Sequence, residues 1–246
     1  MIIERSLLSW NESLLAYYTL LFGIVSVLYT LLAEEQESRQ ESFVSITKRI
    51  PQPLMMSLKA VPAFVSCLFV FSSSNMLNGL SLLLISVFVF YMLGDVAIEI
   101  KFILGMVFFS IAHVVLMTIY LVLVSGYEIT LFTAMGGLVT FSFLSIYGGA
   151  LVRYLNRSPT GLGKYELPVV FYSILLVVMA TASLFFYISA QIAIALLVSA
   201  GTVLFVLSDT LVAIREFHHS YNHSEIATKA TYFPAIYLIS LLSLIL

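Results

Sequence analysis

Uncharged apolar runs of about 20 residues recur along this chain and are separated by short polar stretches. A transmembrane helix needs roughly 20 mostly apolar residues, and eight segments meet this requirement. They are Leu14–Leu32, Leu54–Phe71, Leu77–Gly94, Phe102–Val124, Ile129–Val152, Leu167–Ile188, Ile192–Ser208 and Ala230–Leu246. The pattern therefore predicts an all-α membrane protein, a bundle of eight transmembrane helices.

The polar connections between these segments are short. Ser73–Met76 and Ser125–Glu128 are examples, and links of this length join antiparallel neighbours packed in one bundle. The first connection, Ala33–Pro53, is rich in glutamate and is expected to be a solvated or interfacial helix. No stretch is long enough to fold separately, so residues 1–246 are predicted to form a single polytopic membrane domain.

Composition narrows the class of protein further. Hydrophobic residues make up 61% of the chain and charged residues 10%, whereas soluble domains have about 45–50% and about 25%. The net charge of −2 provides no basic field for nucleic acid. The single Cys67 excludes an internal disulfide and has no metal-ligand spacing. Met1–Glu12 lacks a basic start, so we expect no cleaved signal peptide.

The distribution of Lys and Arg predicts the orientation in the membrane. Only Arg5 falls on the side of the even-numbered connections and the termini, and Lys59 lies within the second segment. The other nine fall in odd-numbered connections: Arg39, Lys48, Arg49, Lys101, Arg153, Arg157, Lys164, Arg215 and Lys229. The positive-inside rule places the odd connections in the cytoplasm and both termini opposite. We expect a multi-pass protein of a bacterial inner membrane.

Five polar residues are predicted to lie at one depth near the cytoplasmic face. The only two aspartates, Asp95 and Asp209, end the third and seventh segments on that side. Lys59 begins the second segment from the same side, and Tyr172 and Tyr232 lie within a turn or two of it. Singly, a snorkelling lysine or an aromatic belt would explain such residues. Together, because burying polar groups in lipid is costly, they predict a functional site.

The histidines leave two interpretations open. His113 lies halfway along its segment and is either a packed, hydrogen-bonded residue or a donor to a substrate oxygen. The others, His218, His219 and His223, cluster in the seventh connection. A pair four residues apart on a helix could bind zinc. Because no HExxH-type acid accompanies them, we predict solvated histidines and assign no metal.

Two weaker patterns concern helix packing. Leu93–Glu99 resembles the segment from Leu207 to Glu216, which would fit a four-plus-four internal repeat that brings the two aspartates together. Small residues that indicate close helix packing are Gly136, Gly137, Gly148, Gly149, Ala180, Ala182 and Ser183.

A series of short motifs links these residues to a known family. The motifs are Lys59-x-x-Pro62, Gly94-Asp95, Phe102-x-x-Gly105, Phe109, Ala112-His113, Pro168-Val169-x-x-Tyr172 with Met179 and Ala182, Gly201-x-x-x-Phe205-x-x-Ser208-Asp209 with Phe217, and Thr231-Tyr232. In this order, over about residues 54 to 240, the chain resembles the YhhN-like lysoplasmalogenase family of integral membrane hydrolases. It departs at Leu116, where the family often has Tyr, and at Phe233-Pro234-Ala235, where a Gln is common.

The resemblance implies hydrolysis of the vinyl ether bond of a lysoplasmalogen, a lysophospholipid of the bilayer. The products are a fatty aldehyde and glycerophosphocholine or glycerophosphoethanolamine. This reaction needs a carboxylic acid and a carboxylate, and two carboxyl groups in one poorly solvated site have pKa values pushed apart. We expect Asp95 and Asp209 to be the catalytic pair and Lys59 to bind phosphate or favour one charged Asp. His113, Tyr172 and Tyr232 would line the pocket, with no metal or cofactor.

Two other functions fit parts of the sequence. A proton-coupled transporter would use paired intramembrane acids and a lysine, but the polar residues gather near one face and no Gly/Pro break marks a midplane site. A zinc-dependent intramembrane hydrolase of amides or lipids would use the histidine cluster.

Overall fold

The computed structural model describes residues 2–41, 52–73, 78–158, 161–218 and 223–246, with side chains described for 12–34 and from 54 onward within these ranges. In chain order the helices are α1 (Ile2–Glu41), α2 (Gln52–Ser73), α3 (Gly79–Ile100), α4 (Phe102–Val124), α5 (Leu131–Asn156), η1 (Gly163–Tyr165), α6 (Glu166–Ala190), α7 (Ala193–Phe217), α8 (Ser224–Ser240) and η2 (Leu241–Leu244). Within these described ranges, eight helical spans are long and apolar enough to cross a membrane. The predicted bundle of eight transmembrane helices is confirmed.

Several helices extend beyond the apolar segments that predicted them. α3 continues past Asp95 to Ile100, and α7 continues past Asp209 to Phe217. The expectation that each aspartate ends a helix was therefore wrong. Hydropathy marks the part of a helix that suits lipid, whereas the backbone hydrogen bonds continue wherever the chain stays helical.

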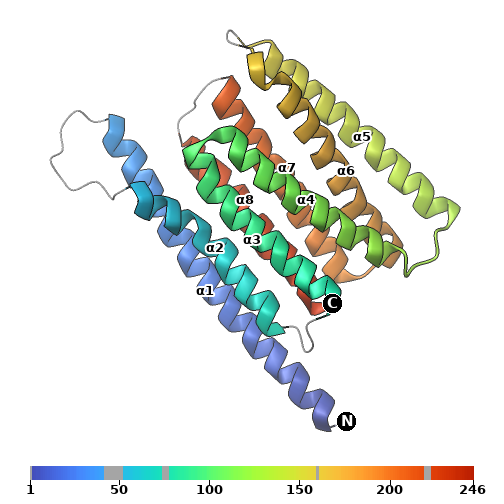
Figure 1. Ribbon diagram of the computed structural model, residues 1–246. Helices are drawn as coiled ribbons and strands as arrows, with labels where there is room; N and C mark the ends of the chain where they lie inside the picture. The colour runs from blue at the N-terminus through green and yellow to red at the C-terminus, as the bar shows by residue number, and fades with distance from the viewer. Residues whose placement is uncertain (1, 42–51, 74–77, 159–160, 219–222) are drawn as a thin grey trace.

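The helices form a bundle with α1 and α2 along one edge and α5 and α6 along the other (Figure 1). Between these edges lie α3, α4, α7 and α8, and the most extensive contacts join sequence neighbours such as α3 with α4 and α7 with α8. One large buried cluster fills the interior. A smaller cluster of Met106, Leu155, Leu162, Val169 and Phe217 fills the end where α5 meets α6.

Two glycines bring the aspartate-bearing helices close to their neighbours. A Cβ added to Gly105 of α4 would lie 2.6 Å from the Cβ of Ile98 on α3. A Cβ added to Gly201 of α7 would lie 2.7 Å from the Cβ of Leu238 on α8. Only glycine permits such backbone approach, so these contacts determine how α3 and α7 sit in the bundle.

The predicted small-residue contacts between α5 and α6 are present at three of four glycines. An added Cβ would lie 2.9 Å from Phe185 at Gly137 and 3.2 Å from Ile188 at Gly136. At Gly148 it would lie 3.1 Å from Val177. Gly149 meets nothing within 4 Å, so this position borders open space.

Side-chain hydrogen bonds join α1 to the rest of the bundle. The hydroxyl of Tyr18 lies 2.9 Å from Ser66 Oγ on α2 and 2.7 Å from Ser240 Oγ on α8. The predicted helix in the first connection is present as far as Glu41, as the continuation of α1. Residues 42–51 of that connection lie outside the described residues.

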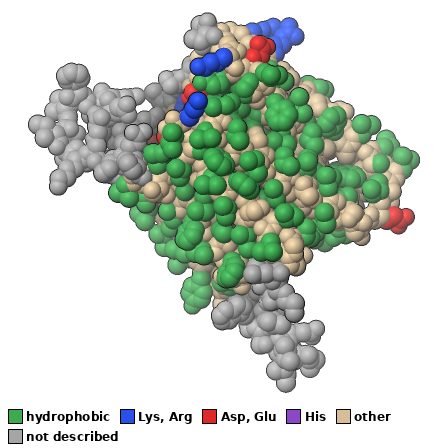
Figure 2. All heavy atoms as spheres, viewed as in Figure 1, with side chains coloured by type: hydrophobic (Ala, Val, Ile, Leu, Met, Phe, Trp, Pro, Cys, Tyr) green, Lys and Arg blue, Asp and Glu red, His purple; other side chains and the backbone are tan. Residues whose placement is uncertain are grey.

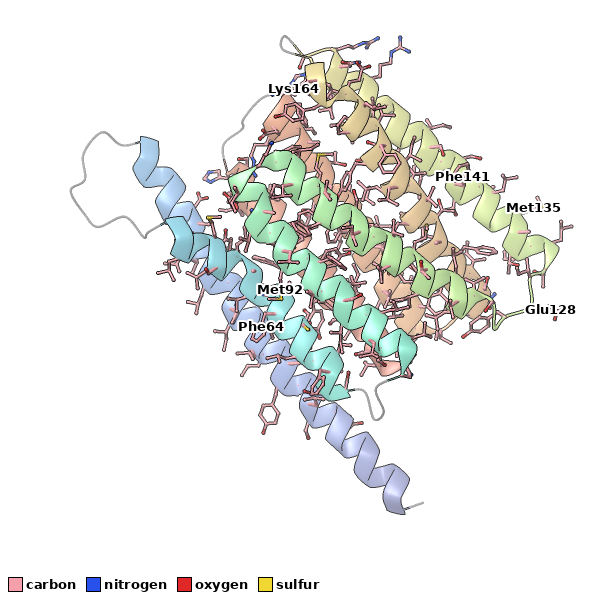
Figure 3. The ribbon with its side chains drawn as sticks, viewed as in Figure 1. Phe64, Met92, Glu128, Met135, Phe141 and Lys164 are labelled. Carbon is pink, nitrogen blue, oxygen red and sulfur yellow. The ribbon has the colours of Figure 1, made fainter. Side chains whose placement is uncertain are left out.

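Apolar side chains cover most of the visible face of the bundle, and Lys and Arg gather at one end (Figure 2). Lys164 lies at that end and Glu128 at the opposite end of α5 (Figure 3). Large apolar side chains stay exposed along the helices, including Leu131, Ile146 and Leu167. An apolar surface of this extent suits lipid rather than water, and the chain is an integral membrane protein.

Candidate active site

A cavity at the basic end of the bundle brings the predicted residues together. It is lined by side chains from every helix from α2 to α8, and its empty volume is about 980 Å³, open space at its mouth included. Five of the six predicted site residues line it: Lys59, Asp95, Tyr172, Asp209 and Tyr232. Most of the remaining lining is apolar, as in typical small-molecule pockets.

Asp209 of α7 belongs to a chain of hydrogen bonds that crosses three other helices. Tyr172 of α6 donates its hydroxyl to Asp209 Oδ2 at 2.6 Å. His113 Nε2 of α4 lies 3.1 Å from the Tyr172 oxygen and 3.8 Å from Asp209 Oδ2. Tyr91 of α3 follows, with its hydroxyl 3.4 Å from His113 Nδ1.

The donors in this chain can be ordered when Asp209 is ionised. A carboxylate only accepts, and Tyr172 has a single hydroxyl proton, which goes to Asp209. The Tyr172 oxygen must then accept from Nε2–H of His113. This tautomer is assigned from the network, and it leaves Nδ1 of His113 to accept from Tyr91.

His113 is the predicted site residue that does not line the cavity. It is fully buried, and both of its ring nitrogens lie beside tyrosine hydroxyls. Its ring also meets Phe205 edge to face at 4.8 Å. The geometry matches the hydrogen-bonded packing interpretation, with His113 in contact with Tyr172 and away from the wall of the cavity.

Asp95 of α3 has a similar arrangement with a different tyrosine. Tyr232 of α8 donates its hydroxyl to Asp95 Oδ2 at 2.7 Å, and Asp95 is 2% exposed. The Tyr232 ring packs edge to face on Phe205 at 5.4 Å. Phe205 contacts both His113 and Tyr232, so a single aromatic ring joins the two aspartate networks.

These partners do not follow the proposed internal repeat. In a four-plus-four repeat, α3 corresponds to α7 and α8 corresponds to α4. Asp95 accepts from a tyrosine on α8, whereas Asp209 accepts from one on α6. The two networks are therefore not related by that symmetry, and the repeat is not confirmed.

Three cationic side chains line the same cavity as Asp95. Lys59 forms an ion pair with Glu99, and Arg215 forms one with Glu225. Lys229 Nζ lies 3.5 Å from Glu225 Oε1 and 5.4 Å from the centre of the Tyr232 ring. Because Lys229 is 3% exposed, a cation is held within the protein beside the tyrosine that binds Asp95.

Sequence reasoning missed Arg215, Lys229 and Tyr91 as members of the site. The two cations were counted only as charges of the seventh connection, but α7 and α8 extend far enough to turn them toward the cavity. The spacing of Glu225 and Lys229, four residues apart, is the helical ion-pair signal that could have found Lys229.

A polar hollow borders the cavity at the basic end of the bundle. It shares Lys59, Phe102 and Arg215 with the cavity and adds Glu99, Lys101 and Glu216 to its wall. The site therefore adjoins a hollow with charged groups of both signs, whereas most of its own lining is apolar.

The loop histidines have other contacts where the structure describes them. His218 stacks on Tyr154 with ring centres 4.3 Å apart, and His223 Nδ1 lies 2.7 Å from Glu34 Oε1. His219 lies outside the described residues. Among the residues that the structure describes, no group of three or more His, Cys, Asp or Glu side chains could hold a metal ion.

Fold and site together define a membrane-embedded helical bundle with one cavity lined by two aspartates. Each aspartate accepts a hydrogen bond from a tyrosine on another helix. The model of the YhhN family matches residues 54–243, which is most of the chain. The chain belongs to the YhhN family. This match includes every residue that lines the cavity and leaves out α1. Comparisons with curated proteins and with solved structures found no match.

Proposed function

We propose that this protein is a lysoplasmalogenase, a membrane hydrolase of the vinyl ether bond in single-chain ether phospholipids. The observation that carries the proposal is the pair Asp95 and Asp209 on one largely apolar cavity, each with a tyrosine donor. Membership of the YhhN family is consistent with this activity.

Cleavage of a vinyl ether requires acid and base groups and water. One aspartic acid gives its proton to the outer carbon of the double bond, which leaves an oxocarbenium ion at the carbon bonded to oxygen. The other aspartate stabilises this cation and takes a proton from the attacking water. The hemiacetal then collapses, its glycerol oxygen receives a proton, and the aldehyde and the glycerophospho compound leave. Neither a covalent intermediate nor a change of oxidation state is needed.

The tyrosines hold the carboxyl groups in place for this chemistry. Tyr172 fixes one oxygen of Asp209 and is itself fixed by His113. Tyr232 likewise fixes one oxygen of Asp95 through its hydroxyl. Positioning of reacting groups to within a fraction of an ångström is a large part of enzymatic rate enhancement.

The charged groups of the cavity and the neighbouring hollow suit a zwitterionic headgroup. The phosphate would exchange for a carboxylate partner of Lys59, Arg215 or Lys229, which pair with Glu99 and Glu225. The carboxylates Glu99 and Glu216, which line the neighbouring hollow, would face the ammonium group. Phosphate recognition by clustered cations is a general feature of such sites. With the predicted topology, the headgroup would face the cytoplasm from the inner membrane of a bacterium.

The test is aldehyde release from a 1-alkenyl lysophospholipid by the purified protein in detergent or nanodiscs. We expect turnover of the vinyl ether and none of the matching 1-alkyl ether, because a saturated ether has no double bond to protonate. Asp95→Asn and Asp209→Asn should each reduce kcat by about 100-fold or more, in the range for general acid–base groups.

One matched control variant tests whether removal of any buried polar group reduces turnover. Tyr120→Phe removes a buried hydroxyl that lies 2.9 Å from Thr202 Oγ1, outside the cavity, and should retain near wild-type turnover. Folded aspartate variants with wild-type kcat would overturn the proposed pair. Absence of aldehyde from the wild-type protein, with proton-coupled uptake in proteoliposomes, would favour the transporter instead.

A further inference from the structure

A second hollow lies on the outside of the bundle, between α5 and α6. Its walls run from Phe141 to Arg157 on α5 and from Val170 to Val178 on α6, and its empty volume is about 1200 Å³, open space included. At 1.5 Å per residue, the α5 wall is about 24 Å long. This length exceeds half of the roughly 30 Å hydrocarbon core of a bilayer, so the groove is long enough to span the hydrocarbon part of one leaflet.

The side of the bundle that carries the groove faces lipid. α5 lies at the edge of the bundle (Figure 1), and Phe141 and Ile174, which line the groove, are 44% and 58% exposed. Gly149 lines the groove and leaves space in it, since a Cβ added there would meet nothing within 4 Å. A lipid chain in the bilayer therefore has direct access to the groove.

The groove borders the cavity that holds the aspartates. Gly148, Ser173 and Val177 line both spaces. Ser173 directly follows Tyr172, the tyrosine that donates to Asp209. The boundary between groove and cavity is thus formed by small or short side chains, one residue away from the Asp209 network.

Positive charge lies at the basic end of the groove. Arg153 and Arg157 line it there, together with Asn156. Neither guanidinium forms an ion pair with a described residue. Two such arginines above an apolar channel complement a phosphate attached to a hydrocarbon chain.

We propose that the α5–α6 groove is the lateral binding site through which a single-chain phospholipid passes from the leaflet to the cavity. Its occupant on entry is the hydrocarbon chain, which lies along the groove while the phosphate meets Arg153 and Arg157. When the lipid reaches the cavity, the phosphate passes to Lys59, Arg215 and Lys229. The linkage between chain and headgroup reaches the aspartates past Gly148. This proposal rests on the proposed function for its substrate and extends it to the route of access.

A photocrosslinking experiment measures occupancy of the groove without turnover. The probe is a 1-alkyl lysophosphocholine with a diazirine in the middle of its chain, bound to the full-length protein in nanodiscs and mapped by mass spectrometry. We expect crosslinks concentrated in residues 141–157 and 170–178, well above those on the lipid-facing helix α1. An even distribution over lipid-exposed helices would overturn the proposal.

A pair of glycine variants makes the test specific. Gly149→Leu places a side chain in the groove from a position where Cβ has free space, and Gly23→Leu does the same on α1, where Cβ also meets nothing within 4 Å. Gly149→Leu should reduce groove crosslinks and kcat/KM for the 1-alkenyl lipid about tenfold, the scale of a few misplaced methylene groups. Gly23→Leu should leave both near wild type, and equal effects of the two variants would refute the groove.

The outcomes separate this proposal from the proposed function. Groove crosslinks without aldehyde release by the wild-type protein would leave a lipid-binding groove and refute the lysoplasmalogenase. Aldehyde release with no groove crosslinks would retain the enzyme and refute this route.

Discussion

The hydroxyl of Tyr172 provides a sharp test of how the site is positioned. It donates to Asp209 at 2.6 Å and accepts from His113 across 3.1 Å. Tyr172→Phe removes this oxygen and leaves the ring in place. A hydrogen bond to a charged group contributes about 1.5–3 kcal/mol, and each 1.36 kcal/mol is a factor of ten in rate. We therefore expect kcat for the 1-alkenyl lipid to fall about 10- to 150-fold.

The assay is steady-state aldehyde release, with KM and kcat measured separately. Because Tyr172 acts through Asp209, KM should change little and the double variant Tyr172→Phe/Asp209→Asn should be no slower than Asp209→Asn alone. Such non-additivity is the mark of residues that act as a unit. A folded Tyr172→Phe protein whose kcat stays within threefold of wild type would refute the positioning role. Additive losses in the double variant would show that Tyr172 acts independently of Asp209.

Three further predictions concern the headgroup, the packing and the chemistry. Lys229→Met should raise KM about tenfold in the aldehyde assay with kcat little changed. The reason is that the lysine would bind the phosphate equally in the ground state and the transition state. An unchanged KM would exclude Lys229 from headgroup binding. Gly201→Ala should lower the thermal midpoint, since its Cβ would lie 2.7 Å from that of Leu238 and overpacking costs about 1–3 kcal/mol; Gly23→Ala is the control, and equal midpoints would contradict the close α7–α8 contact. Treatment with a chelator should leave turnover unchanged, whereas a loss restored by zinc would support the zinc-dependent alternative.

Hydropathy was sufficient to predict the eight helices because polar and charged side chains are costly in lipid, so a membrane-spanning segment is almost free of them. The same constraint pointed to Asp95 and Asp209, which the structure places on one cavity. A carboxyl group that remains near the lipid despite its cost must have a specific environment. Both therefore stand out in a chain with only two aspartates.

Hydropathy could not predict which side of each helix faces the protein interior and which side faces lipid. In a soluble protein the apolar stripe of a helix marks the core, but lipid and protein interior are equally apolar, so this signal is lost. Tyr91 is one of 14 tyrosines, and only the packing of α3 against α4 shows that it meets His113. Arg215 and Lys229 were misplaced because a charge near a helix end satisfies the positive-inside rule whether it faces solvent or a cavity.

The order of polarity through the molecule supports hydrolysis over transport. Charged groups of both signs line the hollow on one side of the cavity, the aspartate–tyrosine pairs line the cavity itself, and the largely apolar α5–α6 groove borders it on the lipid side. A lysophospholipid has the same order: charged headgroup, linkage, hydrocarbon chain. If the lipid binds with its parts in this order, its vinyl ether linkage lies beside Asp95 and Asp209. A transporter of a small polar molecule would have no use for a groove open to the bilayer beside its acids, whereas an enzyme that acts on a membrane lipid needs one.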